Sequence, residues 1–200
     1  MAADLARTAL VVPVSAPRAA AEGALLDAAE RLLVDLGHAA VTTRRLGEEA
    51  GVNHGLVHYY FGSIENVMAQ TLERFTARLI ERQRALYAAE APFLDKWREA
   101  MTYLEADARY QKIWLELQAF AWNRPDLRAR IARVTEEWRI VLSEAFAQER
   151  VNLGLELPLS ALVALVATFN QGIMLERLIG IDEGHTELLA WIEEVLRGNL

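Results

Sequence analysis

The sequence predicts an all-α protein of about nine helices, divided into a small helix-turn-helix domain and a larger helical domain. Apolar residues recur at three- and four-residue spacing through most of the 200 residues, which is the period of an amphipathic helix. Glycine, proline and short polar residues stand between these segments, where helices end and begin. No segment alternates apolar and polar residues as a half-buried strand does.

The composition indicates a folded protein and restricts its chemistry. Apolar residues make up 53% of the chain, enough for a substantial core. The chain has no cysteine, which excludes disulfides and thiolate metal sites. Its formal net charge of -7 argues against non-specific coating of nucleic acid, because that binding requires many lysines and arginines to neutralise phosphates. Any contact with DNA must therefore be local.

Residues 1–19 are expected to form a disordered N-terminal arm, rich in alanine and interrupted by Pro13 and Pro17. Arg7 and the apolar run at residues 8–16 also have the outline of a short signal peptide. Because this run is short and broken by a proline, we favour the arm.

Three helices are predicted in residues 20–62, the first domain. The first helix spans about 20–36, where apolar and charged residues fall on opposite sides, and Gly37 ends it. The second and third helices are short, at about 43–50 and 53–60.

The second and third helices have the sequence form of a helix-turn-helix. We expect Thr43 to cap the second helix, Gly51 to end it in a left-handed conformation, and Asn53 to cap the third. In a helix-turn-helix the later helix lies in the major groove of DNA. The expected core residues are Leu46, Ala50, Val52, Val57 and Phe61.

The candidate DNA contacts are polar and basic residues at the starts of these two helices. Free backbone N–H groups there favour a phosphate, and an arginine can donate two hydrogen bonds to guanine. We favour Arg44 for a base contact and Arg45 for the DNA backbone, and we expect an exposed Leu56 to touch a thymine methyl or a sugar. The full set is Thr42, Thr43, Arg44, Arg45, Asn53, His54, Gly55, Leu56, His58, Tyr59 and Tyr60. The alternative is that the arginines are solvated charges and the tyrosines are packing residues.

Six further helices are predicted in residues 63–200. They span about 63–88, a segment beginning at Pro92, 110–122, a segment from Pro125 to about Gln148, 158–179, and 185–196. The first of them is long enough to link two parts of the molecule. The helix at 158–179 is apolar nearly all round, so we expect it to be buried on more than one side.

Large aromatic side chains gather in the second domain and suggest a roomy apolar cavity for a ligand. The residues expected to line it are Trp97, Met101, Trp114, Gln118, Trp138, Phe169, Asn170 and Met174. Gln118 and Asn170 would orient a largely apolar molecule. A plain core built from large rings is the alternative, since aromatic residues at helical spacing commonly just pack.

The helices at 158–179 and 185–196 are expected to form a four-helix interface in a homodimer. A symmetric dimer would match a palindromic DNA site, with its two reading heads one helical turn apart. A ligand that binds better to another spacing of the heads would shift the population away from DNA.

The segment at residues 41–63 resembles the DNA-binding signature of the tetracycline-repressor (TetR) family. The resemblance implies a homodimer whose first three helices read DNA, whose fourth acts as a lever, and whose remaining helices sense a ligand and dimerise. By motif position, the DNA contacts implied are Thr43, Arg44, His54, Gly55, Leu56, Tyr59 and Tyr60. Two positions depart from the family pattern: Ile64 stands where a lysine is common and His58 where a tyrosine is common. Loss of the lysine should lower affinity for DNA and its salt dependence.

The predicted function is a DNA-binding transcriptional regulator, a repressor released from a palindromic double-stranded operator by a small apolar effector. The alternative is a helix-turn-helix dimer without small-molecule sensing, regulated by a protein partner.

Other classes of protein are disfavoured by what the sequence lacks. Neither a Gly-rich phosphate loop nor a nucleophile motif is present, so we expect no enzyme and no cofactor. His54 and His58 stand four apart as metal ligands do, but no third ligand is placed near them, so we expect no metal. Without a run of eighteen apolar residues we expect no membrane span, and we predict a cytoplasmic protein.

Overall fold

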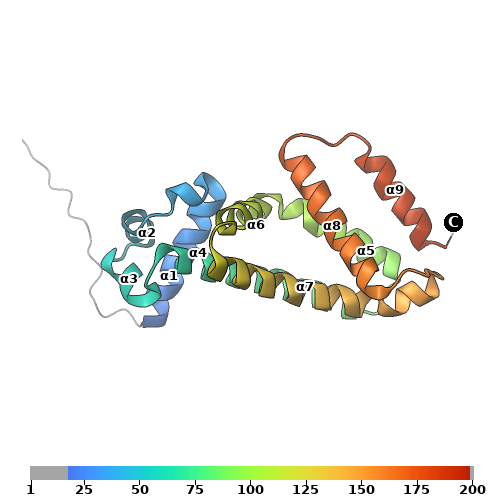
Figure 1. The fold of residues 1–200 in the computed structure, drawn as a ribbon, viewed down its shortest axis with the longest axis horizontal. Helices are drawn as coiled ribbons and strands as arrows, with labels where there is room; N and C mark the ends of the chain where they lie inside the picture. Colours follow the sequence, from blue (N-terminus) through green and yellow to red (C-terminus); the bar gives the residue numbers. More distant parts are fainter. Residues whose placement is uncertain (1–17, 199–200) are drawn as a thin grey trace, which may run out of the picture. The chain divides into compact units, whose positions relative to one another are not determined.

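The computed structural model describes residues 18–198, apart from the side chains of residues 108 and 109, and every α-helix or short helical turn in this range is shown in Figure 1. The described part contains nine α-helices and no strand, which confirms the predicted fold class. The helices are α1 (Arg18–Leu36), α2 (Thr43–Ala50), α3 (Gly55–Phe61), α4 (Ile64–Ala88), α5 (Phe93–Ala106), α6 (Ala108–Ala121), α7 (Pro125–Asn152), α8 (Leu159–Leu178) and α9 (His185–Leu196), with a 3-10 turn η1 (His38–Ala40). The chain forms two compact units, Met1–Thr71 and Leu72–Leu200, called unit 1 and unit 2.

Unit 1 is built on a small apolar core shared by α1, α2, α3 and the start of α4. Its fully buried side chains include Leu25, Leu33, Leu46 and Val57. Helix α1 begins at Arg18, two residues earlier than predicted; the rest of the predicted arm lies outside the described residues. The core thereby fixes α2 and α3, of eight and seven residues, which are too short to persist in isolation.

The ends of α2 differ in how well they were predicted. Thr42, and not Thr43, caps the helix: its backbone is extended and its Oγ1 accepts a hydrogen bond from the Arg45 N–H at 3.3 Å. Thr43 is the first helical residue, so its prediction as the cap is wrong by one position. Gly51 ends the helix with φ 67° and ψ 29°, the left-handed conformation that was predicted.

The junction of α3 and α4 is held by side-chain hydrogen bonds. Gly62 turns the chain with φ 75°. Ser63 Oγ then caps α4 by accepting from the Asn66 N–H at 3.1 Å, and Asn66 Nδ2 donates back to the Phe61 carbonyl at 2.8 Å. The boundary between the units falls later, after Thr71 within α4 and not near residue 63, since the first turns of α4 bury side chains within unit 1.

In unit 2, α7 runs parallel to the second half of α4 (Figure 1). Arg130 on α7 donates to Glu73 on α4 through two bonds of 2.6 Å. Further along both helices, Trp138 Nε1 donates to Gln83 Oε1 at 2.8 Å. Because the two pairs follow in the same order along both helices, α4 and α7 run in the same direction. Together they form one long side of unit 2.

Helix α8 packs on α7 around a cluster of buried side chains, Leu142, Phe146, Leu162, Val163 and Ala167. Its opposite face is not covered within the protomer. Leu165 is 58% exposed, and Leu175 and Leu178 are exposed beside it. Burial of this second face of α8 in a dimer stays a prediction.

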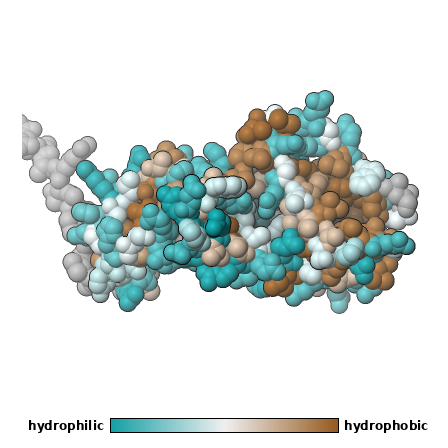
Figure 2. All heavy atoms as spheres, in the orientation of Figure 1, coloured by the Kyte–Doolittle hydropathy of each residue, from teal (hydrophilic) through white to brown (hydrophobic). Residues whose placement is uncertain are grey.

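Helix α9 contacts α5, where Arg98 donates to Glu193 at 2.5 Å. Figure 2 shows apolar side chains gathering around α8 and α9 on the face drawn. Within the described residues, α8 is the one helix long and apolar enough to cross a membrane; a single such helix is weak evidence for a span, because core helices of soluble proteins pass the same test.

Candidate nucleic-acid interface and ligand cavity

Helices α2 and α3 are held at close range by a glycine. A Cβ placed on Gly47 would lie 2.8 Å from the Cα of His54 and 2.9 Å from its backbone nitrogen. Real Cβ atoms do not come so close to backbone, so only glycine allows α2 to meet the turn at this distance. Gly47 was not among the residues predicted to matter, although an isolated glycine inside a short helix is itself a sign of close packing.

The first turn of α3 presents small and polar residues. Asn53 Oδ1 accepts a hydrogen bond from the Gly55 N–H at 2.8 Å, as a capping side chain does, although His54 and not Asn53 is the residue directly before α3. His54 and Gly55 are exposed. Leu56 was expected to be exposed but is half-buried, because its side chain partly enters the boundary between helix and core.

The two arginines of α2 are both exposed but differ in their partners. Arg44 Nε donates to Glu48 Oε1 at 2.8 Å, and this hydrogen bond raises the pKa of the Arg44 guanidinium. A contact of Arg44 with a base must compete with that carboxylate. Arg45, the next residue, is also exposed. Its backbone N–H donates to the Thr42 hydroxyl.

The aromatic side chains of α3 divide into exposed and packed groups. Tyr59 is 76% exposed, whereas Tyr60 is half-buried with its ring 5.2 Å from that of Tyr59 and the Arg18 guanidinium 5.8 Å from its centre. His58 Nδ1 lies 3.1 Å from the Gly62 carbonyl. A carbonyl only accepts, so Nδ1 must carry the proton in this bond, and Nε2 can donate to a phosphate only from the imidazolium.

The predicted DNA contacts therefore lie together on α2, α3 and the residues just before them. Eight are exposed: Thr42, Arg44, Arg45, Asn53, His54, Gly55, His58 and Tyr59. The half-buried ones are Thr43, Leu56 and Tyr60. Their role at DNA stays a prediction.

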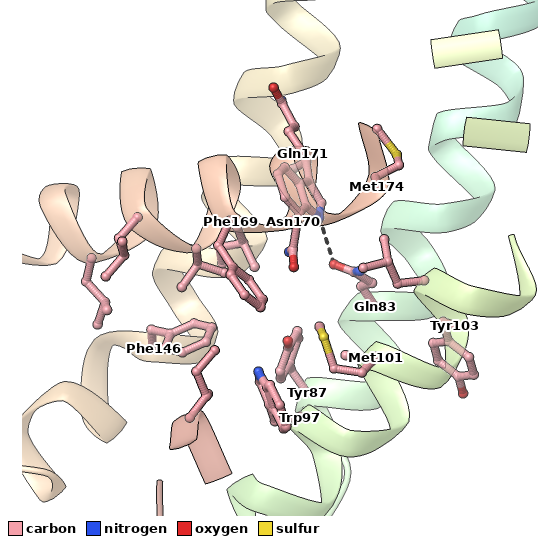
Figure 3. Close-up of a pocket in the computed structure, with 18 of the residues that line it drawn as sticks. Gln83, Tyr87, Trp97, Met101, Tyr103, Phe146, Phe169, Asn170, Gln171 and Met174 are labelled. Atoms are coloured by element: carbon pink, nitrogen blue, oxygen red, sulfur yellow. Dashed lines mark hydrogen bonds between the residues drawn. The ribbon is translucent and has the colours of Figure 1, made fainter. Parts of the chain in front are cut away.

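Unit 2 encloses a cavity of about 420 Å³ between α4, α5, α6, α7, α8 and α9. Seven of the eight residues predicted to line it do so: Trp97, Met101, Trp114, Trp138, Phe169, Asn170 and Met174. Gln118 does not, because it lies one turn beyond Trp114 along α6, past the part of that helix that forms the wall. Figure 3 shows Phe169 and Asn170 reaching from α8 toward Tyr87, Trp97 and Met101 on the facing helices.

Helix α4 contributes lining residues that were not predicted from the sequence. Gln83 and Tyr87 lie four apart on that helix and both face the cavity, with Gln83 bonded to Trp138. The Tyr87 ring stacks at 6.1 Å on Phe93, and burial raises the pKa of the Tyr87 phenol to about 12. The four-residue spacing of polar residues within the apolar stripe of α4 was the available signal.

The wall on the α8 and α9 side is open. Leu165 and Trp191 line the cavity and yet are 58% and 57% exposed. Trp122, on the contrary, is exposed and does not line it. Within residues 18–198, no group of three or more His, Cys, Asp or Glu side chains is placed to hold a metal ion.

Comparisons with known proteins match the small domain by sequence and the whole chain by fold. Residues 25–71 match the family model described as "Bacterial regulatory proteins, tetR family". The chain is 40% identical over 68 residues to the HTH-type transcriptional regulator BetI of Rhizobium meliloti (strain 1021), a match that covers 34% of this chain and 32% of that protein. The chain thus spans about a third of that relative's length.

Two solved structures illustrate the similarity of fold. A putative TetR-family transcriptional regulator from Rhodococcus sp. superposes with a TM-score of 0.73 at 19% identity, covering 89% of this chain and 99% of that one. The regulator FadR from Bacillus subtilis, in complex with stearoyl-CoA, superposes with a TM-score of 0.69 at 16% identity, covering 89% and 98%. With the helix-turn-helix geometry of unit 1, these findings assign residues 25–71 to the tetR family of bacterial regulatory proteins, and the chain shares its fold with solved regulators of that family.

Proposed function

We propose that the protein is a cytoplasmic transcriptional regulator that binds a palindromic DNA operator as a homodimer. The observation that carries this proposal is the exposed surface formed by the starts of α2 and α3, where Arg44, Arg45 and His54 are all exposed. The surface combines donors for phosphate with side chains that can reach base edges.

A binding selection on random duplexes tests the DNA-binding part of the proposal. We expect an enriched site with two-fold symmetry and half-sites about one helical turn apart. Arg44→Ala should weaken binding to the selected duplex about 10- to 100-fold and relax the preference at one base pair of each half-site. Arg45→Ala should weaken binding to all duplexes alike. A selection that enriches nothing would refute DNA binding.

The dimer is proposed to form through α8 and α9. The exposed apolar side chains of α8, together with Trp191 of α9, make a surface that a second copy would bury. Leu175→Glu places a charge on this surface at a residue that does not line the cavity. Sedimentation should then report a monomer for the variant and a dimer for the unchanged chain, with the far-ultraviolet circular dichroism of both preserved.

A repressor released by a small apolar effector is the regulatory part of the proposal. Its support is the cavity in unit 2, which is lined mainly by apolar and aromatic side chains. The fold relative from Bacillus subtilis was solved with stearoyl-CoA, which supports a ligand site in this class of domain. An effector that binds one arrangement of the dimer better than another shifts the population between DNA-bound and free protein.

Tryptophan fluorescence tests whether a small molecule binds in the cavity. Trp97, Trp114, Trp138 and Trp191 line the cavity, so an occupant changes their emission. Trp122→Phe removes the exposed tryptophan that does not line it and lowers the background. Operator affinity is then measured against the concentration of each compound that binds. If no compound changes that affinity, the protein is a DNA-binding dimer regulated by a protein partner.

A further inference from the structure

The cavity wall contains one neutral side chain, that of Asn170, with a buried polar atom that no described residue pairs. Asn170 Oδ1 is inaccessible to solvent, and no described residue donates a hydrogen bond to it. Figure 3 shows its side chain directed into the cavity between Phe169 and Gln83. A buried carbonyl oxygen without a donor is costly, so such groups in native proteins call for an explanation.

Four other neutral polar side chains of the wall, those of Thr76, Gln83, Gln111 and Thr135, are engaged within the protein. The hydroxyls of Thr76 and Thr135 donate to carbonyls of their own helices. Gln83 accepts from Trp138, and Gln111 donates to the Leu104 carbonyl at 2.6 Å. Asn170 differs from them, because its amide faces the space that a ligand would fill.

The charged side chains of the wall are also engaged. Arg82 pairs with Asp107 and lies 4.2 Å from the centre of the Tyr103 ring. Arg150 donates to the carbonyls of Leu155 and Leu157 and so holds the loop before α8. Each of these guanidinium groups keeps a buried Nε–H without an acceptor, but both groups belong to contacts that organise the wall.

These charges disfavour ionic ligands. Two arginines and one aspartate leave the lining without a free carboxylate to balance a bound cation. The Tyr87 phenol stays neutral, since burial raises its pKa to about 12. A bound carboxylate could accept from the Asn170 NH₂, but it has no proton to donate and would leave Asn170 Oδ1 unpaired. A neutral group is the best match to this wall.

We propose that the effector is a neutral amphiphile, an apolar molecule bearing one hydroxyl or amide group, and that this group donates its proton to Asn170 Oδ1. The amide NH₂ of Asn170 can in turn donate to the same group, so a hydroxyl or amide satisfies both sides of the asparagine. Apolar lining supplies most of the affinity, and Asn170 selects among apolar molecules by their polar group. This inference rests on the proposed sensing function.

A series of probes that share a chain of ten carbons tests the inference in the full-length Trp122→Phe protein. Each probe is used below its critical micelle concentration. The probes are 1-decanol, methyl decyl ether, decanoate and decyltrimethylammonium, and the readout is tryptophan fluorescence. We expect 1-decanol to bind at least about tenfold more tightly than the ether, which can accept but not donate, and than either ion. Tighter binding of decanoate or of decyltrimethylammonium than of 1-decanol would overturn the inference.

Two substitutions on α8 locate the selectivity. Asn170→Leu keeps the size of the side chain and removes its amide, so it should bind 1-decanol and methyl decyl ether equally. Thr168→Val is the matched control, because it also removes a polar group from α8, but from an exposed side chain that does not line the cavity, and it should keep the preference for the alcohol. A preference that persists in Asn170→Leu refutes the role of Asn170.

The same experiment separates this inference from the function on which it rests. Asn170→Leu should also raise the melting temperature of the empty protein, because an unpaired buried amide is replaced by an apolar group. Binding of all four probes with equal affinity overturns the selectivity alone. Failure of every probe to bind the unchanged chain overturns small-molecule sensing and the selectivity together, while DNA binding is measured separately.

Discussion

Replacing Gly47 by alanine tests whether the contact between α2 and the following turn sets the geometry of the DNA-reading surface. Alanine favours a helix over glycine by about 1 kcal/mol. At Gly47 the new Cβ would stand 2.8 Å from the Cα of His54. Carbon atoms separate comfortably at about 3.5–4.0 Å, so the turn must move away from α2 by about 1 Å. Overpacking of this kind costs about 1–3 kcal/mol, which offsets the gain in helix propensity.

Gly23→Ala is the matched control. Gly23 lies inside α1 of the same unit, and a Cβ there meets no atom within 4 Å. The control should stabilise unit 1 by about 0.5–1 kcal/mol, since it gains the propensity without a clash. Because the propensity gain is common to both variants, their difference in stability, about 1–3 kcal/mol, reports the clash alone.

The assay must report on unit 1, because all five tryptophans lie in unit 2. Amide hydrogen exchange of α1 and α2, followed by mass spectrometry, gives the free energy of opening of unit 1. Binding to the selected duplex should weaken about tenfold or more in Gly47→Ala and stay unchanged in Gly23→Ala, since a shift of 1 Å displaces α3 from its base contacts. If both alanines stabilise unit 1 equally and both bind DNA normally, the close contact does not matter.

Three further changes probe charge in the two units. Ile64→Lys should add one phosphate contact per protomer and steepen the slope of log affinity against log salt by about 0.9 for each contact, with Ile64→Gln as the uncharged control. Glu48→Gln should raise DNA affinity about two- to fivefold by freeing Arg44 and removing a carboxylate near phosphate, whereas Glu90→Gln makes the same change of net charge in unit 2 without effect. The Tyr87 pKa is raised from 10 in the unfolded chain to about 12, so its contribution is complete below pH 10 and is lost as pH rises toward 12. Between these pH values the unchanged chain should lose up to about 3 kcal/mol of its free energy of unfolding, measured by denaturant titration. Tyr87→Phe should abolish this loss, whereas Tyr59→Phe should not.

Local signals predicted the helices well because each boundary rests on the chemistry of one or two residues. The left-handed Gly51 is an example, and α9 spans the predicted residues. The errors came where equivalent residues stood side by side. Thr42 and Thr43 can both cap a helix, and only the backbone conformation in the folded unit decides between them.

The cavity shows why site residues are harder to predict than helices. Periodicity identifies which side of α6 faces the core, and Trp114 was placed correctly for that reason. It does not reveal how far a cavity extends along a helix axis, and so Gln118 was wrongly included. Gln83 and Tyr87 were missed because their place depends on how α4 packs beside α7 and α5, over distances along the chain that no local pattern records.

The charge of the small domain bears on how it can hold DNA. Residues 20–62 contain three arginines and six carboxylates, so this domain is itself acidic. Arg31 is bonded to Glu49 at 2.8 Å and Arg44 to Glu48, which leaves few cations to release counterions from phosphate. Neutral donors must therefore supply much of the affinity, through the start of α2 and the exposed Tyr59 hydroxyl. Such contacts are short-ranged and directional, so binding depends on the exact distance between α2 and α3 that Gly47 permits. A small change in that distance costs more here than it would in a strongly basic domain, where long-range attraction tolerates misplacement.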